Sequence, residues 1–336
     1  RMLAAVGLEG RTNQLLRALA DVEQLCLFLD NVGQHSEQHG QTARCQAAFH
    51  VLEHFITDAG QTITAKDYAV AAGGKGLNQS LAAARAGAEV LHAGAIGAEG
   101  RFMADLLRES GADTSLLREV DGPSGHAVIE INAAGQNRII VFGGANRSMT
   151  SEYIERVLDT AQPDDWVLLQ NEVNLVPEII RRAHEKGLRV VFNPSPVPEN
   201  LDALPLACVS LFMVNEIEAA QLAGTDANAD FEDTLTALRA KYPNASVVMT
   251  VGADGVLYDG EEGRFQLPAF KVKAVDTTAA GDTFCGYFLA AVSAGKSVQT
   301  ALQEASAASA LAVSRTGAAP SVPTADEVRE FLRRHA

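Results

Sequence analysis

Basic residues are scarce in this sequence. Lys and Arg together number 27 against 42 Asp and Glu, which gives a formal net charge of −15. Surfaces that bind nucleic acid or anionic membranes need a basic face, so the composition argues against both kinds of partner. A phosphate-bearing substrate remains compatible with it, because local lysines, Mg²⁺ and backbone N–H groups can hold a phosphate.

Cysteines are few, and long apolar runs are missing. The four cysteines show neither C-x-x-C nor disulfide-rich spacing (Cys26, Cys45, Cys208 and Cys285). This pattern predicts reduced thiols in a cytoplasmic protein. No apolar run approaches the roughly 18 residues of a membrane span, and no charged-then-apolar signal peptide opens the sequence. We therefore expect no membrane partner.

What the sequence does contain is typical of a soluble α/β enzyme. It has 336 residues, of which 47% are hydrophobic and 21% are charged, and from residue 60 onward β-prone runs alternate with helical patterns. The predicted strands are 90–96, 166–170, 188–192, 209–214, 246–251 and 255–258, and the predicted helices are 77–86, 102–109, 151–160, 174–186, 215–223, 230–241, 284–294 and 298–313. Such alternation indicates a doubly wound, mostly parallel sheet.

Two regions do not fit a parallel core. The runs His126–Asn132 and Asn137–Phe142 are joined by Ala-Ala-Gly-Gln, which is a hairpin signal, and residues 62–70 form a further predicted strand. We interpret these segments as a small separate β-sheet, a lid built from about 61–71 and 123–143. No repeat or low-complexity linker divides the chain, so residues 58–336 are predicted to form one domain with this lid.

Residues 1–57 form an atypical N-terminal segment. Helical spacing occurs twice in it, at Leu15, Leu19, Val22, Cys26 and Leu29 and again at Cys45, Ala48, Leu52 and Phe55 or Ile56. This predicts two amphipathic helices joined by the polar stretch 33–41. A strand at 25–29 is the alternative, because short apolar runs are ambiguous.

The segment Asp-Thr-Thr-Ala-Ala-Gly-Asp-Thr-Phe at 276–284 joins a strand-like run to an apolar helical pattern. Small residues at 279–281 let a ligand approach the backbone, and the first N–H groups of the helix can hold an anion. A carboxylate at Asp282 would repel a bound phosphate, so Asp282 is a candidate base for an attacking hydroxyl. The alternative is an ordinary helix cap.

A second glycine-rich turn, Gly73-Gly74-Lys75-Gly76, precedes another helical pattern. Its glycines allow a tight turn and close backbone approach. Asn78 lies in the first helical turn, where its amide offers a donor and an acceptor to sugar hydroxyls. Glycine-rich turns of this kind are also common as purely structural connections.

Polar residues follow several predicted strands at the edge where α/β sheets bind ligands. Glu172 is one of them, with a helix-leading cap as the alternative. Asn215 and Glu218 offer hard ligands for Mg²⁺, usually through water, although an Asn cap with first-turn acids has the same pattern. Thr250, Gly252 and Gly255 lie in a link between two strands.

The two glycine motifs together closely resemble the signatures of the ribokinase family, the phosphofructokinase-B-type carbohydrate kinases, and the resemblance covers about residues 60–332. It implies a ribokinase-like fold whose lid covers the sugar, with ATP and Mg²⁺ as cofactors. It implies that Asp282 is the catalytic base and that the backbone N–H groups of Ala280 and Gly281 stabilise the transferring phosphoryl group. The sugar-binding residues that it implies are Gly74, Lys75, Gly76, Asn78, Glu172 and Asp282. The nucleotide-binding residues that it implies are Asn215, Thr250, Gly252, Gly255, Gly281 and Ser306.

The resemblance also implies activation by a monovalent cation. The matching positions for K⁺ are oxygens of Asp276, Thr278, Ala312, Arg315, Gly317 and Ser321. Homodimerisation through the lid is a further arrangement that we infer.

The start of the chain departs from the family. Its members begin with a strand followed by a G-S-x-N-x-D-like segment that binds the sugar, but residues 43–50 contain no such pattern. Either this segment is an extension with an altered sugar site, or it is a reading-frame artefact. We expect residues 47–55 to supply the missing core strand, with residues 25–29 as the alternative, and sugar affinity to be poor while ATP binding stays near normal.

One motif indicates a different chemistry. His50-Val51-Leu52-Glu53-His54 matches H-x-x-E-H, a zinc-peptidase pattern that requires a helix. A five-residue pattern recurs by chance, so zinc hydrolysis is the weaker hypothesis.

The leading hypothesis is an ATP-dependent sugar kinase that transfers the γ-phosphoryl group to a primary hydroxyl of a pentose such as ribose. The alternatives are a nucleoside or other furanoside kinase, and a catalytically silent sugar- or nucleotide-binding protein of the same fold.

Overall fold

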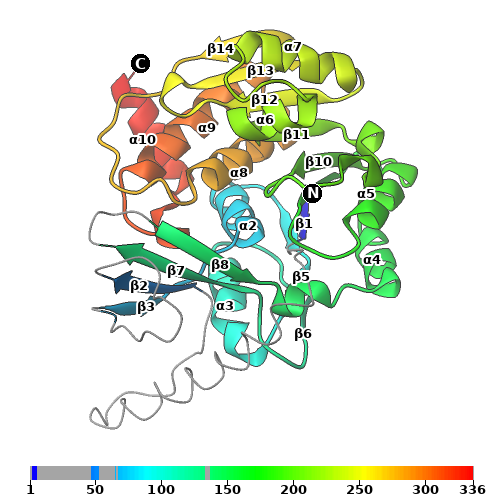
Figure 1. Cartoon of the computed structure of the whole chain (residues 1–336), viewed down its shortest axis with the longest axis vertical. Coiled ribbons are helices and arrows are strands. Elements are labelled where there is room, and N and C mark those ends of the chain that lie inside the picture. The colour runs from blue at the N-terminus through cyan, green and yellow to red at the C-terminus, as the bar shows by residue number, and fades with distance from the viewer. Residues whose placement is uncertain (1, 6–46, 53–64, 66, 133–136, 336) are drawn as a thin grey trace.

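The computed structural model describes residues 2–5, 47–52, 65, 67–132 and 137–335 (Figure 1). Its centre is an eight-stranded sheet with the order β14-β13-β12-β11-β10-β9-β1-β4. The strands are β1 (Met2–Ala5), β4 (Val90–His92), β9 (Trp166–Gln170), β10 (Arg189–Asn193), β11 (Leu211–Asn215), β12 (Ser246–Thr250), β13 (Val256–Gly260) and β14 (Gly263–Leu267). All pairs from β4 to β12 are parallel, and β13 and β14 add an antiparallel edge. The predicted doubly wound, mostly parallel sheet is confirmed.

Helices cover both faces of this sheet. One face packs against α2 (Lys75–Arg85), α3 (Arg101–Glu109), α8 (Ala280–Ser293), α9 (Val298–Val313) and α10 (Ala325–His335). The other packs against α4 (Ser151–Leu158), α5 (Val176–Glu185), α6 (Glu216–Ala223) and α7 (Phe231–Lys241). Alternate strand residues feed the two cores: in β10, Val190 and Phe192 belong to one cluster and Val191 to the other. The strands are apolar in continuous runs because both of their faces are buried.

Short 3₁₀ turns connect several of these elements. They are η1 (Ala98–Gly100), η2 (Gly144–Arg147), η3 (Leu201–Ala203), η4 (Leu206–Cys208), η5 (Gly252–Asp254) and η6 (Ala319–Ser321). Among the described residues, no helix is long and apolar enough to cross a membrane.

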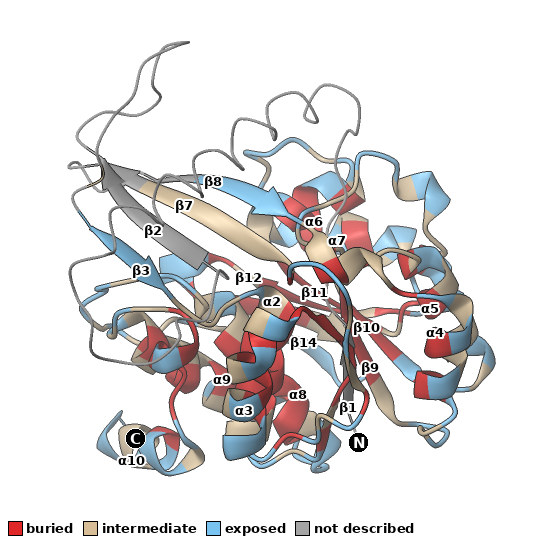
Figure 2. Ribbon diagram, turned by 90° about the horizontal axis from the view of Figure 1, so that it is seen from below, coloured by how far each residue is buried: buried red, intermediate tan, exposed pale blue. Residues whose placement is uncertain are grey.

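A second sheet of four strands lies beside the α2 and α3 side of the molecule (Figure 1). Its order is β3 (Tyr68–Val70), β2 (Ala47–Leu52), β7 (His126–Asn132) and β8 (Asn137–Phe142). Strands β7 and β8 form the predicted hairpin. The residues of β3 and residues 139–142 of β8 are exposed (Figure 2). The predicted separate small sheet is therefore present. Two further strands, β5 (Gly94–Ile96) and β6 (Leu117–Glu119), pair in parallel and form a separate two-stranded sheet.

Our assignment of the first core strand was wrong. Met2–Ala5 occupies that position, paired in parallel with β9 on one side and β4 on the other. Residues 47–52 instead form β2 in the lid, between β3 and β7. The helix predicted from 45 onward is also wrong for 47–52, because pairing along the whole of β7 overrides the local helical spacing. The helix predicted at 15–29 and the alternative strand at 25–29 lie outside the described residues.

The strand at residues 47–52 also removes the structural basis of the zinc-peptidase pattern. His50 lies in a strand, whereas the motif needs its two histidines on one helical face. Glu53 and His54 lie outside the described residues. No group of three or more metal-binding His, Cys, Asp or Glu side chains occurs in the described part of the chain.

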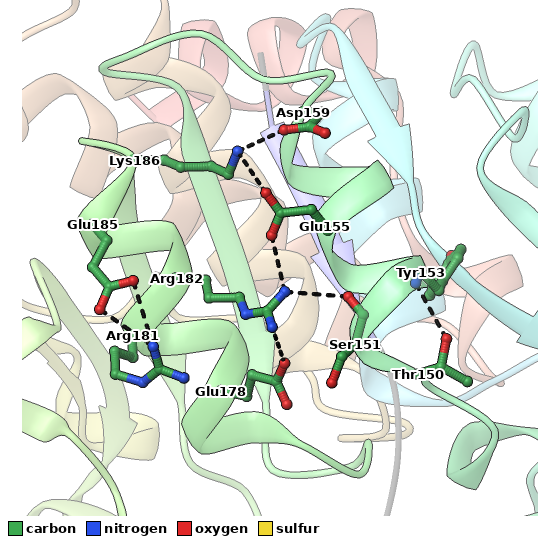
Figure 3. A network of polar contacts seen from close by, with 10 residues as sticks. All are labelled: Thr150, Ser151, Tyr153, Glu155, Asp159, Glu178, Arg181, Arg182, Glu185 and Lys186. Carbon is green, nitrogen blue, oxygen red and sulfur yellow. Dashed lines mark hydrogen bonds and ion pairs between the residues drawn. The ribbon is translucent and has the colours of Figure 1, made fainter.

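A surface ion-pair network ties α4 to α5 (Figure 3). Arg182 contacts Glu155 at 2.9 Å and Glu178 at 2.8 Å, and Lys186 contacts Asp159 at 2.6 Å. These pairs lie on the outer side of the helices and are partly exposed, so each adds little to stability. We assign this network a structural role.

Helices α2 and α8 approach each other closely at Gly286. A Cβ atom at this position would lie 2.5 Å from Ala82 Cβ, 2.6 Å from the Gln79 carbonyl oxygen and 2.7 Å from the Ala83 nitrogen. Two of these neighbours are backbone atoms, which cannot move aside without moving the helix. Glycine at 286 therefore sets the distance between the helices that carry both predicted glycine motifs.

Replacing Gly286 with alanine is expected to destabilise the protein by about 1–3 kcal/mol, because the added methyl group forces α2 and α8 apart. Urea unfolding of Gly286→Ala against the wild type measures this. Ala294→Ser, at the exposed end of α8, adds one atom without crowding and should change stability by less than about 0.5 kcal/mol. Equal stabilities for both variants would show that the contact at Gly286 does not constrain the helices.

Candidate functional site

Polar residues gather at the carboxyl ends of the central strands. Gln170, Asn193, Asn215 and Thr250 are the last residues of β9, β10, β11 and β12. Their strands pair in register, Gln170 with Asn193 and Asn215 with Thr250. The amino ends of α2 and α8 reach the same edge, which is where open α/β sheets bind ligands.

Asp282 lies in the first turn of α8 and is held by two side-chain amides. Asn78 Nδ2 donates to Asp282 Oδ2 at 2.9 Å, and Gln79 Nε2 donates to Asp282 Oδ1 at 2.9 Å. The helix begins after Ala279, whose φ of 60° turns the chain sharply into α8. Residues 204 and 203 positions apart in the sequence, one from each glycine motif, are therefore in direct side-chain contact.

One lysine lies between two carboxylates at this point. Lys75 Nζ lies 3.5 Å from Glu172 Oε1. Burial raises the pKa of both Glu172 and Asp282, and the positive charge of Lys75 acts against that rise. Burial alone would lower the pKa of Lys75, but attraction to Glu172 and Asp282 outweighs it and raises that pKa. Lys75 is therefore a firmly charged group at neutral pH.

Two cavities meet at these residues. The larger, of about 320 Å³, is lined by Gly74, Asn78 and Glu172 and by the inner side of β7 and β8 of the lid. The smaller, of about 250 Å³, is lined by Asn193, Asn215, Glu218, Thr250 and Gly281. Lys75, Ala279 and Asp282 line both cavities. A molecule in each cavity would therefore have Asp282 between them.

The backbone at the start of α8 has free donors facing the smaller cavity. Thr283 N–H donates to the Ala279 carbonyl at 2.8 Å, so the N–H groups of Gly281 and Asp282 precede the first intrahelical bond. A Cβ at Gly281 would meet no atom within 4 Å, which leaves its backbone open to a ligand. The N–H of Ala280 differs, since it donates to the Thr277 carbonyl at 3.3 Å.

Asn215 and Glu218 form the cap of α6. Asn215 Oδ1 accepts from the Glu218 N–H at 2.8 Å, and Glu218 Oε2 accepts from the Asn215 N–H at 3.1 Å. The alternative that we considered, an Asn cap, is thus realised. Both residues still line the smaller cavity, and Glu218 is buried with no lysine or arginine paired to it among the described residues. A buried carboxylate on the cavity wall that forms no ion pair among the described residues fits a metal ion bound from the cavity.

Three residues matched to nucleotide binding lie away from the lining of the two cavities. Gly252 and Gly255 lie in the turn after β12, and both have positive φ. A Cβ at Gly255 would lie 2.0 Å from the Leu267 carbonyl oxygen, so this glycine is needed for packing against β14. Ser306 is half-buried in α9. The other matched nucleotide residues, Asn215, Thr250 and Gly281, line the smaller cavity.

The residues matched to a monovalent cation lie in a loop at 276–278 and in the end of α9 with the loop that follows it, and Asp276 joins the two loops. Its Oδ1 accepts from the Thr278 N–H at 2.9 Å and its Oδ2 from the Gly317 N–H at 2.9 Å. Burial acts to raise the pKa of Asp276, but these hydrogen bonds outweigh it and lower that pKa. An ionised Asp276 therefore holds the two loops together.

The other matched positions in these loops have separate contacts. The Ala312 carbonyl accepts from the Arg315 N–H at 3.0 Å, and the Arg315 guanidinium pairs with Glu327 at 2.6 Å. Ser321 is fully buried, and its hydroxyl donates to the Ala318 carbonyl at 2.7 Å. The Arg315 side chain is therefore engaged elsewhere, as expected of a residue that offers only its carbonyl.

Sequence reasoning missed four polar residues of this site. Asn193 lines the smaller cavity, and Gln79 and Gln170 lie behind Asp282. His92 lines the larger cavity, with Nδ1 2.8 Å from the Ser80 hydroxyl. Burial lowers the pKa of His92 to about 4, so it is neutral at pH 7. Asn193 and Gln170 end apolar strands, and this was the available signal. Gln79 ends the glycine motif that begins at Gly73, but no role was assigned to it, and His92 carried no signal.

Comparisons with known proteins agree with this geometry. A family model described as pfkB family carbohydrate kinase matches residues 44–325. Ribokinase from Haemophilus influenzae is 34% identical over 293 residues, covering 85% of this chain and 95% of that protein. Among solved structures, ribokinase from Cryptococcus neoformans in complex with ADP has a TM-score of 0.75 at 35% identity, covering 85% of this chain and 96% of that one. Arabidopsis thaliana ribokinase complexed with ribose and ATP has a TM-score of 0.74 at 29% identity, with the same coverage.

Removing the Lys75 charge should make stability more sensitive to pH. In Lys75→Met the pKa values of Glu172 and Asp282 rise further above their ordinary values of 4.5 and 3.8. A carboxyl group with a raised folded-state pKa loses its stabilising contribution as the pH rises through that pKa. The stability difference between wild type and Lys75→Met should therefore be smallest near pH 4 and grow toward pH 7.

Urea unfolding across this pH range measures the difference. Lys241→Met is the matched control, because Lys241 donates to the Leu222 carbonyl at 2.7 Å rather than to a carboxylate. Its effect should not vary with pH. A Lys75→Met difference that is constant from pH 4 to pH 7 would refute the role of Lys75 as the shared counter-charge.

Proposed function

The chain belongs to the pfkB family of carbohydrate kinases, and on that premise we propose that it transfers the γ-phosphoryl group of ATP to a primary hydroxyl of a pentose such as ribose. The observation that carries the proposal is the meeting of two cavities at Asp282. Ribokinases from Haemophilus influenzae and Bacillus subtilis are 34% and 33% identical to this chain, and two relatives named deoxyribokinase are 31% identical. One similar structure is titled as a ribokinase complexed with ribose and ATP.

The sugar occupies the larger cavity in this proposal. Asn78, Lys75 and Glu172 line it with an amide, an ammonium and a carboxylate, which suit hydroxyl groups. The backbone of Gly74 and Gly76 lets the sugar approach the start of α2. The lid strands β7 and β8 contribute apolar side chains to the same cavity, such as Ile129 and Phe142. They would cover the carbon face of the sugar and exclude water from the reaction.

ATP lies in the smaller cavity with its γ-phosphate toward Asp282. Asp282 accepts the proton of the sugar hydroxyl as the new O–P bond forms and the bond to ADP breaks. The N–H groups of Gly281 and Asp282 stabilise the charge on the transferring phosphoryl group. Hydrogen bonds from Asn78 and Gln79 orient the carboxylate.

The metal and the rest of the nucleotide fit the remaining polar groups. Asn215 and Glu218 would hold Mg²⁺ through water, and the ion would neutralise phosphate charge when bound. Thr250 faces the nucleotide cavity. Gly252, Gly255 and Ser306 would contact the nucleoside end of ATP beyond this cavity.

We further propose that two copies of the chain associate through the lid. Its strands β3 and β8 expose large apolar side chains, including Tyr68 at 51% and Ile140 at 58% exposure, whereas the neighbouring Ile139 lines the larger cavity. Contiguous exposed apolar residues of this size favour a protein contact. A second copy offers the same face, as a symmetric dimer requires.

Asp282→Asn tests the catalytic assignment. The variant keeps the shape of the side chain but cannot accept a proton, so kcat should fall by about 10²–10⁴-fold, with ATP binding retained. A coupled ADP-release assay measures turnover on ribose, other pentoses, hexoses and nucleosides. Turnover of nucleosides in preference to ribose would identify a nucleoside kinase instead.

Two other outcomes bear on the same assignment. Near-normal kcat in Asp282→Asn would exclude Asp282 as the base. ATP binding without turnover of any acceptor by the wild type would favour a silent binding protein and overturn the proposed kinase activity.

A monovalent cation is expected to activate the enzyme. The two loops joined by Asp276 offer several oxygens but little formal charge, which suits K⁺ better than a divalent ion. Activity should therefore rise on addition of K⁺ to a potassium-free buffer and rise less with Na⁺. Asp276→Ala should abolish this response, because Asp276 holds both loops. Activity that does not depend on K⁺ would remove the cation site from the proposal.

A further inference from the structure

A chain of buried amides stands behind Asp282. Gln170 Nε2 donates to Gln79 Oε1 at 2.5 Å. Gln79 Nε2 in turn donates to Asp282 Oδ1 at 2.9 Å and to Asn193 Oδ1 at 3.0 Å. Gln170 is 0% exposed and Gln79 is 1% exposed. The chain joins β9, α2, β10 and α8 at the point where the two cavities meet.

The charge of Asp282 sets the direction of this chain. An ionised carboxylate only accepts hydrogen bonds, so Gln79 must turn its NH₂ group toward Asp282. Its Oε1 then faces Gln170, which must present its own NH₂ group. As a result Gln170 Oε1 has no partner among the described residues although it is buried. An unpaired buried carbonyl costs free energy, so this orientation is imposed from the Asp282 end of the chain.

Gln79 differs from the other donor to Asp282 in one respect. Asn78 lines the larger cavity, where it can exchange its contact with the carboxylate for one with a sugar hydroxyl. Gln79 lines neither cavity. Both of its amide hydrogens and its oxygen are already used inside the protein. Its hydrogen bond to Asp282 is therefore the one that persists when the sugar enters.

We propose that Gln79 is a positioning residue that fixes the orientation of the Asp282 carboxylate and favours its ionised form. This proposal rests on the kinase activity proposed above, and it adds Gln79 as the residue that orients the catalytic base Asp282. Gln79 also donates to Asn193, which lines the smaller cavity, so the same amide group contacts both Asp282 and a residue of the proposed nucleotide site.

Other charged groups surround Asp282 and bear on its protonation. Lys75 on α2 favours the ionised carboxylate, while Glu172 after β9 disfavours the negative charge. Glu218 on α6 acts on Lys75. The thiol of Cys285, also on α8, is kept protonated by burial. Burial raises the pKa of Asp282, and the hydrogen bonds from Asn78 and Gln79 oppose that rise.

Gln79→Met tests the proposal by pH profile. The variant keeps a side chain of similar length but donates no hydrogen bond. We expect kcat to fall by roughly tenfold to a hundredfold with little change in KM for ATP, because a misplaced base slows the chemical step. Loss of the donor disfavours the carboxylate, so the acid limb of the kcat profile should move to higher pH. Gln303→Met, at an exposed position on α9, should change neither.

A purely structural role gives a different result. If Gln79→Met lowered kcat equally at every pH and left the acid limb in place, the inference would be overturned. An unchanged kcat would overturn it as well.

A double-mutant cycle in unfolding keeps the test independent of kinase turnover. If Gln79 acts on the charge of Asp282, then Gln79→Met should lower the unfolding midpoint less in an Asp282→Asn background than in the wild type. Additive effects would overturn the inference. If the wild type phosphorylates no sugar, the proposed function fails, and this cycle still decides whether Gln79 positions Asp282.

Discussion

The close approach of α2 and α8 is the constraint on which the site depends. Gly286 has no side chain, and this lets the backbone of α8 rest against Ala82, Ala83 and the carbonyl of Gln79. The amino ends of both helices then converge, and two residues of α2 reach the carboxylate of α8. With a wider spacing Asp282 would face solvent from a free helix end. A packing contact one helical turn after Asp282 thus determines the geometry of a side chain in the shared wall of the two cavities.

Much of this arrangement was predictable, because its signals are local. Strands after residue 60 appear as apolar runs, and the polar residues that end them, such as Glu172 and Asn215, mark the ligand-binding edge. Asp282 was identified because a carboxylate is out of place at an anion-binding turn. Helix caps and ligand residues share the same sequence pattern, however, and Asn215 and Glu218 prove to be a cap on the wall of a cavity.

The remainder could not be predicted for physical reasons. Met2–Ala5 is only four residues long, and it forms a strand because it pairs with β4 on one side and β9 on the other. Residues 47–52 have helical spacing, yet their pairing with β7 makes them a strand. The role of Gln79 exists only in three dimensions, since a glutamine in a helix has no sequence pattern that marks it as a donor to a distant carboxylate. Tertiary contacts decide each of these cases.

The position of β1 has a consequence for how the chain acquires its structure. Met2–Ala5 pairs on one side with β4 and on the other with β9, and Leu3 lies opposite Val167. Residues 2–5 are synthesised long before β9, so half of the pairing surface of β1 does not exist until residue 170 has been synthesised. The neighbouring pairs from β9 to β14 join strands that follow one another in the chain. Insertion of β1 is therefore the most non-local step in assembling the sheet, and such pairings form slowly because a long loop must close first.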